Sequence, residues 1–491
     1  MVRLLVIHLN SDDPYGSAEG FPPEPPPVRE NPRPIPGFPC EFQPADEGGC
    51  DTTVVKRSEP RSPLPFDAKY DNLAVRETGG DQSGLPGRDL LYPEYSIRNK
   101  AAYRDDWNDE EGGISNKTVL TDVIQQNGLT MYDTHNLYGA LMSTASYDAM
   151  LNRRPGKRPM IITRSTFSGT GHKVGHWLGD NLSTWEQYRV SIRTMLIFTS
   201  LFQFPMTGSD VCGFGGDTTE ELCARWAALG AFNTFYRNHN SLDSSSQEFY
   251  LWDTVAESAR KAIEIRYRLL DYMYTAMAKA SADGTPVQYP MFYLYPEDKA
   301  TWALENQFFY GPGILVAPIL DEGATSVDAY LPEDIFYDWY THDPVCGSAD
   351  THTFSDVDTT SIPLLIRSGV ILPLRASSAN TTTALRKEDF EILIPVDADG
   401  KASGELYFDD GESLDPESNG GVTWITLEYE DGELVIDGEF GYEVPVTISK
   451  ITLLDGRSAC GSSGDSARAS EASKTQKVEV SLNEAGSIRI E

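Results

Sequence analysis

Two aspartates occupy polar, glycine-containing segments that follow apolar stretches of the chain. Asp180 lies in Gly175-His-Trp-Leu-Gly-Asp-Asn181, and Asp210 lies in Thr207-Gly-Ser-Asp-Val-Cys-Gly-Phe214. Hydrolysis of a glycosidic bond commonly uses two carboxyl groups: one protonates the leaving oxygen, and the other attacks or stabilises the reacting carbon. The two aspartates are therefore a candidate pair for this chemistry, and Trp177 would help to raise the pKa of Asp180 by excluding water.

Further polar side chains follow apolar stretches elsewhere. Arg164 comes directly after the stretch 159–163, and Arg237 and His239 come after the stretch 232–236. Guanidinium, carboxylate, imidazole and aromatic groups together suit a neutral sugar, because its hydroxyls form hydrogen bonds and its C–H face stacks on rings. The residue types therefore favour a sugar as the ligand.

A purely structural interpretation of the same residues stays open at this point. Asp180 could cap a helix that starts at Ser183, and Asp210 could lie in a turn. His239 could serve only a hydrogen bond at the end of a strand.

A regular alternation of elements must position these side chains. From Lys157 onward, short apolar runs alternate with amphipathic stretches, which is the pattern of β/α units on a parallel sheet. The pattern predicts strands at 159–163, 202–206, 232–236 and 286–292, and helices at 183–201, 218–230 and 253–282. Thr218 with Glu221 predicts a capping box for the second helix, and the third should end before Gly284.

Four such units are half of what a closed barrel requires. A (β/α)8 barrel has eight, its active site is built by the loops after the strands, and nothing before residue 130 offers four more units. After Asn306 the chain changes to short alternating runs with Gly and Pro turns, which predicts two β-sandwiches. The expected fold is therefore α/β plus all-β, with the second half of a (β/α)8 barrel followed by two β-sandwich domains. The predicted parts are a Pro-rich extended insertion or linker at 1–130, a partial barrel at 131–301, a proximal sandwich at 302–392 and a distal sandwich at 393–491.

Charge and hydropathy exclude several classes of partner. The 491 residues have a formal net charge of −34, which disfavours nucleic acid and anionic membrane surfaces. No run of about 18 apolar residues occurs, and the first residues do not resemble a signal peptide.

Cysteines and sequons favour an exported protein. The six cysteines lack C-x-x-C spacing, which suits disulfides better than a zinc site, and sequons occur at Asn116, Asn181 and Asn380. Cys212 and Cys223 could form a local disulfide or remain two buried thiols. We therefore expect a secreted or cell-wall-associated parent protein.

Five ordered motifs resemble glycoside hydrolase family 31, and within it the fungal and intestinal α-glucosidases. They are the two aspartate segments together with Tyr132-Asp-Thr-His-Asn-Leu-Tyr-Gly139, Arg158-Pro-Met-Ile-Ile-Thr-Arg-Ser-Thr-Phe167 and Phe235-Tyr-Arg-Asn-His-Asn240. The resemblance runs from about residue 130 to 410. Residues 20–130 resemble the Pro-rich insertion of fungal members, and 410–491 resemble their last sandwich more loosely.

The resemblance implies a role for each site residue. It makes Asp180 the general acid/base, and it replaces the pairing of Asp180 with Asp210, which becomes a ligand of a sugar hydroxyl. The residues implied to hold the terminal glucose are Arg164, Trp177, Asp210, Phe214, Arg237 and His239. Cys212 and Cys223 match a disulfide of the family. The implied ligands are α-glucoside oligosaccharides, with no cofactor and no metal.

One expected motif does not occur in these 491 residues. The family's nucleophile is the aspartate of a W-x-D-M-N-E segment, and a loose alignment places His8 opposite it, with Asp12 and Asp13 as nearby carboxylates. We expect instead that an N-terminal half or subunit supplies the nucleophile, so that this chain alone is inactive.

The resemblance also predicts an activity, with rivals. The expected parent is a retaining exo-α-glucosidase that releases glucose from the non-reducing ends of α-1,4 or α-1,6 glucosides. The alternatives are an α-xylosidase or transglucosidase of the same family, or a non-catalytic glycan-binding chain.

Overall fold

A computed structural model describes residues 90, 119, 121–125, 127–460 and 473–490. The chain divides into two compact units, Met1–Tyr138 and Gly139–Glu491. In the first unit, helix α1 (Met131–Thr134) is capped by the side chain of Thr130 and is followed by η5 (His135–Leu137). The predicted Pro-rich region 1–130, with His8, Asp12, Asp13 and Asn116, lies almost wholly outside the described residues.

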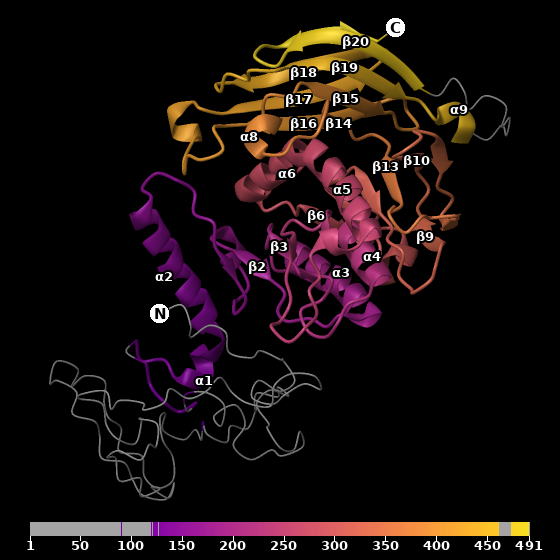
Figure 1. Ribbon diagram of the computed structural model, residues 1–491. Coiled ribbons are helices and arrows are strands. Elements are labelled where there is room, and N and C mark those ends of the chain that lie inside the picture. Colours follow the sequence, from indigo (N-terminus) through magenta and orange to yellow (C-terminus); the bar gives the residue numbers. More distant parts are fainter. Residues whose placement is uncertain (1–89, 91–118, 120, 126, 461–472, 491) are drawn as a thin grey trace, which may run out of the picture. The chain divides into compact units, whose positions relative to one another are not determined.

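Short parallel strands alternate with helices in the first part of the second unit (Figure 1). The elements are α2 (Tyr138–Arg153), β1 (Ile162–Thr163), η6 (Thr170–His172), β2 (Gly175–Trp177), α3 (Trp185–Ser200), β3 (Thr207–Gly208), β4 (Asp210–Val211), α4 (Glu220–Gly230), β5 (Arg237–Asn238), η7 (Phe249–Leu251), α5 (Asp253–Arg268) and α6 (Leu270–Asp283). Strands β1, β2 and β3 pair in parallel, and so do β4 and β5. This β/α alternation agrees with the predicted partial barrel.

The boundaries of β3 and α4 differ from the predicted ones. The strand expected at 202–206 forms later, at β3, because Gln203 has a positive φ of 56° and Pro205 has no N–H for a ladder. Helix α4 is capped by Thr219, whose side chain accepts from the Leu222 N–H, so the predicted capping box at Thr218 is wrong.

The helix expected at 253–282 is two helices. Leu269 has φ −89° and ψ 6°, is fully buried, and separates α5 from α6. Helix α6 then packs on β14 (Leu372–Arg375) and β16 (Ala402–Phe408) of the last domain. No glycine or proline marks this break, because tertiary packing sets the direction of α6. The chain leaves α6 at Gly284, with φ +81°, as predicted.

The fourth predicted barrel strand belongs to another sheet. Within 286–292, β6 (Gln288–Pro290) pairs antiparallel with β7 (Phe308–Tyr310), and the chain then enters α7 (Met291–Leu294). A short apolar run carries no signal for parallel or antiparallel pairing, so the prediction of a parallel barrel strand here was wrong. The proximal sheet therefore begins before residue 302.

The proximal part is a six-stranded sheet with a separate two-stranded sheet. The strand orders are β11-β10-β13-β8-β7-β6 and β12-β9. The elements are η8 (Lys299–Ala303), β8 (Ile314–Val316), β9 (Val327–Leu331), β10 (Ile335–Asp338), β11 (Pro344–Cys346), β12 (Asp350–Phe354) and β13 (Leu364–Arg367). Its aromatic and aliphatic side chains, Phe308 and Phe336 among them, are fully buried.

The distal part consists of two four-stranded sheets, ordered β14-β15-β19-β20 and β16-β17-β18-β21. The elements are β14 (Leu372–Arg375), α8 (Thr382–Leu385), β15 (Phe390–Pro395), β16 (Ala402–Phe408), η9 (Glu417–Asn419), β17 (Thr423–Glu430), β18 (Glu433–Phe440), β19 (Thr447–Leu454), α9 (Arg457–Cys460), β20 (Ser473–Ser481) and β21 (Gly486–Arg489). Apolar side chains of both sheets form one core.

The boundary between the two β parts lies earlier than predicted. Strand β14 pairs antiparallel with β15, so a division at 392/393 would cut β15 and separate the pair. The distal part therefore begins near β14. Figure 1 shows its sheets, in orange and yellow, lying over α5 and α6.

Candidate active site

The predicted site residues lie where the parallel strands begin and end. Arg164 directly follows β1, Trp177 ends β2, and Asp180 lies in the loop after β2. Asp210 and Arg237 open the neighbouring strands β4 and β5, where their Cα atoms are register partners. This register brings the two side chains together although 27 residues separate them in sequence.

A buried ion pair joins Asp210 to Arg237. Both Nε and Nη2 of Arg237 donate to Oδ1 of Asp210, the Nε contact being 2.9 Å long. The Asp210 side chain is fully buried, whereas that of Arg237 is 36% exposed. Burial raises the pKa of Asp210 to about 6, and the Arg237 charge opposes that rise. Burial therefore disfavours the ionised form of Asp210, and the positive charge of Arg237 favours it.

One oxygen of this carboxylate is left for another group. Oδ2 of Asp210 and the indole N–H of Trp177 are buried and have no hydrogen-bond partner among the described residues. The Trp177 side chain nevertheless acts on this carboxyl, because it lowers the pKa of Asp210 against the larger effect of burial. An acceptor and a donor of this kind can both bond to one ligand hydroxyl, and the role of Asp210 as a hydroxyl ligand stays a prediction.

Aromatic rings surround the ion pair. The Arg237 guanidinium lies 5.1 Å from the centroid of the Trp177 ring and 5.7 Å from that of Phe235. The rings of Phe214 and His239 lie 5.5 Å apart with an interplanar angle of 37°. Phe235 was not predicted as a site residue, because an aromatic residue inside an apolar run indicates a buried core position.

The charge of Asp180 acts on two of the predicted neighbours. It raises the pKa of Arg164 against the larger lowering effect of burial, and it raises the pKa of His239, which burial and Arg237 lower. Gly179, with φ +92°, lets Arg164 approach: a Cβ there would lie 2.9 Å from Arg164 Nε. Asp180, Arg164 and His239 therefore belong to one electrostatic cluster.

The structural alternative is wrong for Asp180 and confirmed in part for Asp210. Helix α3 begins at Trp185, and its cap is Thr184, whose side chain accepts from the Gln187 N–H, so Asp180 does not cap it. Asp210 is buried and begins strand β4, and its carbonyl accepts from the Gly213 N–H at 3.2 Å, so it also opens a turn.

His176 was not predicted, although it stands within the Asp180 segment. Its Nε2 donates to the Arg164 carbonyl at 2.9 Å, and its ring stacks on Phe198 at a centroid distance of 4.0 Å. Burial lowers the pKa of His176 to about 4, so the imidazole stays neutral and holds the backbone of Arg164 in place.

Asn181 and Gln247 connect the loops of the site. The Asn181 Nδ2 donates to the Asp210 carbonyl at 3.0 Å, and its Oδ1 accepts from the Phe214 N–H at 3.0 Å. The Gln247 Nε2 donates to the Gly213 carbonyl at 2.9 Å. Neither amide was predicted in this role, because their partners lie about 30 residues away in sequence.

We expect no glycan at Asn181 in folded protein, despite its sequon. The side chain is 9% exposed and both ends of its amide are bonded, whereas Asn380 is exposed. The test is glycopeptide mapping by mass spectrometry of protein secreted from a eukaryotic host. Glycan at Asn380 with none at Asn181 is the expected result, and a glycan at Asn181 in folded protein would contradict this assignment.

The predicted disulfide is present. Cys212 and Cys223 are bonded, with Cα atoms 4.5 Å apart, and tie the loop that carries Phe214 to α4. A second disulfide joins Cys346 to Cys460 across 114 residues and links the proximal and distal parts. Cys40 and Cys50 lie outside the described residues.

Clusters of metal ligands and membrane-spanning helices are both absent from the described part of the chain. No three His, Cys, Asp or Glu side chains there gather as metal ligands. No helix there is long and apolar enough to cross a membrane.

Two family descriptions match the chain. Residues 94–276 match the glycosyl hydrolases family 31 TIM-barrel domain, and residues 284–372 match the glycosyl hydrolase family 31 C-terminal domain. The second match spans most of the proximal sheet and ends at the start of β14, in agreement with the boundaries set by strand pairing.

Curated relatives and solved structures give the same assignment. The chain is 50% identical over 483 residues to the probable alpha/beta-glucosidase agdC of Aspergillus fumigatus, covering 98% of this chain and 50% of that protein. It is 38% identical over 421 residues to a probable alpha-glucosidase of Oryza sativa subsp. japonica, covering 82% of this chain and 45% of that protein. The crystal structure of a glucosidase II alpha subunit superposes with a TM-score of 0.69 at 29% identity, covering 76% of this chain and 44% of that one.

The chain spans about half the length of the curated relatives it matches. Its β/α region and proximal sheet match the two domains of a single family, in the same order, and its long alignments are to glucosidases. The chain therefore belongs to glycoside hydrolase family 31.

Proposed function

We propose that this chain is the C-terminal part of a retaining exo-α-glucosidase that releases glucose from the non-reducing ends of α-1,4 or α-1,6 glucosides. The observation that carries the proposal is the unsatisfied Oδ2 of buried Asp210 beside the unsatisfied N–H of Trp177, next to the cluster of Asp180, Arg164 and His239. A glucose hydroxyl supplies both a donor and an acceptor to those atoms.

In this mechanism the chain supplies the acid and the sugar contacts. Asp180 protonates the leaving oxygen in the first step and removes a proton from water in the second. The nucleophile is a carboxylate on polypeptide outside these 491 residues, which contain no W-x-D-M-N-E segment. An N-terminal half or a separate subunit is thus the proposed partner, and this chain alone binds glucose without turnover.

We also propose export to the cell exterior or cell wall for the whole protein. Two disulfides in the described residues and the exposed sequon at Asn380 support this, because disulfides persist in oxidising compartments.

The assay that tests the proposed function compares this chain with a polypeptide that also carries the N-terminal half. The extended polypeptide is expected to hydrolyse maltose and aryl α-glucoside, and the 491-residue chain to hydrolyse neither. If the extended polypeptide hydrolyses aryl α-xyloside faster than aryl α-glucoside, the proposed α-glucosidase activity is wrong and an α-xylosidase activity takes its place. Glucose binding without turnover by both polypeptides would favour a non-catalytic glycan-binding chain.

A further inference from the structure

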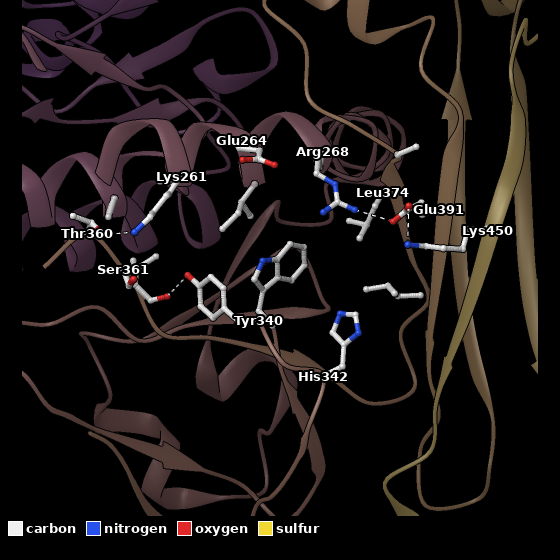
Figure 2. Close-up of a pocket in the computed structure, with 17 residues that line it drawn as sticks. Lys261, Glu264, Arg268, Tyr340, His342, Thr360, Ser361, Leu374, Glu391 and Lys450 are labelled. Carbon is white, nitrogen blue, oxygen red and sulfur yellow. Dashed lines mark hydrogen bonds and ion pairs between the residues drawn. The ribbon is translucent and has the colours of Figure 1, made fainter. Parts of the chain in front are cut away.

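A cavity away from the candidate active site lies where the barrel helices, the proximal sheet and the distal sheet meet. It measures about 680 Å³, which falls within the range of about 300–1,000 Å³ typical of small-molecule sites. In Figure 2, Lys261, Glu264 and Arg268 of α5 form one wall, and Tyr340 and His342 face them. None of the residues that line it belongs to the candidate active site.

The walls of this cavity are held in place by ion pairs and hydrogen bonds. Glu391 of β15 pairs with Arg268 at 2.9 Å and with Lys450 of β19 at 2.8 Å. The Arg268 Nε also donates to the Arg375 carbonyl at 2.9 Å, and the Lys261 Nζ donates to the Thr360 hydroxyl at 2.6 Å. These contacts cross between α5 and both β parts, so the cavity has a defined shape before any ligand enters.

Three polar groups in the cavity retain their full hydrogen-bonding capacity. The Glu264 carboxylate, the His342 imidazole and the Trp339 indole N–H have no hydrogen-bond partner among the described residues. All three residues line the cavity, and together they carry both acceptors and donors. A ligand that uses all three must itself carry several groups that both donate and accept.

Aromatic surface accompanies these groups. The Tyr340 hydroxyl donates to the Ile362 carbonyl at 2.8 Å, which fixes its ring, yet the residue is 53% exposed. The Trp339 side chain also lines the cavity. Fixed rings beside free polar groups provide stacking for a C–H face together with hydrogen bonds for hydroxyls.

The charges in and around the cavity are balanced. Lys261 is paired with Glu257, and Arg268 and Lys450 share Glu391. Glu264, which has no ion pair among the described residues, offsets the remaining positive charge. Burial and the charges of Lys450 and Arg268 lower the pKa of His342, which therefore adds no positive charge near pH 7. A balanced site gives no net electrostatic attraction to an anion or a cation, and the chain's charge of −34 disfavours anions further.

We propose that this cavity is a second saccharide site, which takes a short neutral sugar such as a glucose disaccharide away from the catalytic centre. At the cavity wall His342 has φ +65°, in a turn in which its backbone N–H donates to the Asp338 carbonyl at 2.9 Å. The proposal does not depend on hydrolysis, because it concerns binding alone.

The test measures maltose binding by titration calorimetry in the polypeptide that also carries the N-terminal half. All proteins carry Asp210→Asn and Arg237→Met, which weaken sugar binding at the candidate active site by removing two of its proposed contacts. In that background we expect saturable maltose binding, weakened at least tenfold by His342→Gly combined with Glu264→Ala. Neither change threatens folding, since glycine relieves the positive φ and alanine favours the helix.

Matched controls keep the result specific. Ala349→Gly also replaces an exposed residue with positive φ, 54°, and Arg260→Ala also truncates an exposed side chain of α5; neither residue lines the cavity. Both controls should change the maltose Kd less than twofold. The proposal is overturned if the background protein does not bind maltose, if the cavity variants bind like the controls, or if inorganic phosphate binds where maltose does not.

Discussion

Replacement of Asp180 by asparagine is expected to lower kcat/KM for maltose roughly 10²- to 10⁴-fold in the polypeptide that carries the N-terminal half. Asparagine keeps the size of the side chain but cannot give a proton to the leaving glucose or take one from water. Initial rates of glucose release across maltose concentrations measure the effect. Circular dichroism of both proteins verifies that the fold is retained.

The dependence on the leaving group separates acid catalysis from a structural role of Asp180. An aryl glucoside with an acidic phenol leaves without protonation, so the variant should still form the glycosyl-enzyme and release a burst of phenol. Azide, which attacks without needing a general base, should then accelerate turnover and yield a glucosyl azide. A loss of equal size for maltose and for the activated substrate, with no effect of azide, would disprove the assignment.

A matched carboxylate shows that the effect belongs to this position. Asp356 is exposed between β12 and β13 of the proximal part and has no ion pair among the described residues. Asp356→Asn should leave kcat/KM within about twofold, since exposed substitutions away from a site have small effects.

The second large effect is on stability. Arg237→Met is expected to lower the free energy of unfolding by about 3 kcal/mol at pH 7, because it leaves the carboxylate of Asp210 buried without its partner. We take the lower end of the range for such losses, since the Arg237 side chain is 36% exposed and solvent screens part of the attraction. Urea unfolding followed by fluorescence measures the difference.

A double variant distinguishes the unpaired charge from lost packing against Trp177 and Phe235. Asp210→Asn with Arg237→Met removes the charge as well and should recover most of the lost stability. If the double variant is as unstable as Arg237→Met alone, the loss comes from packing rather than from the buried carboxylate.

The pH dependence of this loss has a definite sign. The pKa of Asp210 is raised to about 6 in the folded protein, against about 3.9 in an unfolded chain. The contribution of this group is therefore fully present below about pH 4 and is lost as the pH rises through about 6. Without Arg237 the pKa rises further, so the destabilisation by Arg237→Met should be smaller at pH 5, where the carboxyl holds its proton in both proteins. A larger loss at pH 5 than at pH 7 would show that the pKa is not raised.

The proposed second saccharide site could not be predicted from the sequence. Its free groups, Glu264, Trp339 and His342, come from a helix and from the loop after β10, and no spacing connects them. Each taken singly is an ordinary surface or core residue. Only the packing of α5 against both β parts brings them to one cavity.

Local chemistry determined much of the fold. The sequence correctly predicted the β/α alternation, the helix end at Gly284 and the change to β structure after the barrel. These features depend on helix periodicity, caps and turn residues, which act over a few positions of the chain. The ordered motifs likewise identified the family and the residues around Asp180.

Tertiary structure alone decided what depends on distant partners. Three features could not be predicted from short stretches of sequence, because they follow from strand pairing and packing between distant residues. They are the antiparallel pairing of β6, the break at Leu269 and the start of the distal part at β14. The same reason applies within the site: Asp210 meets Arg237 through the register of β4 and β5, and the buried Asn181 side chain joins two loops by hydrogen bonds. The sequence by itself determined which groups are candidates for the chemistry, and the pairing of strands far apart in sequence decided which of those groups meet, since hydrogen bonds and burial act through space.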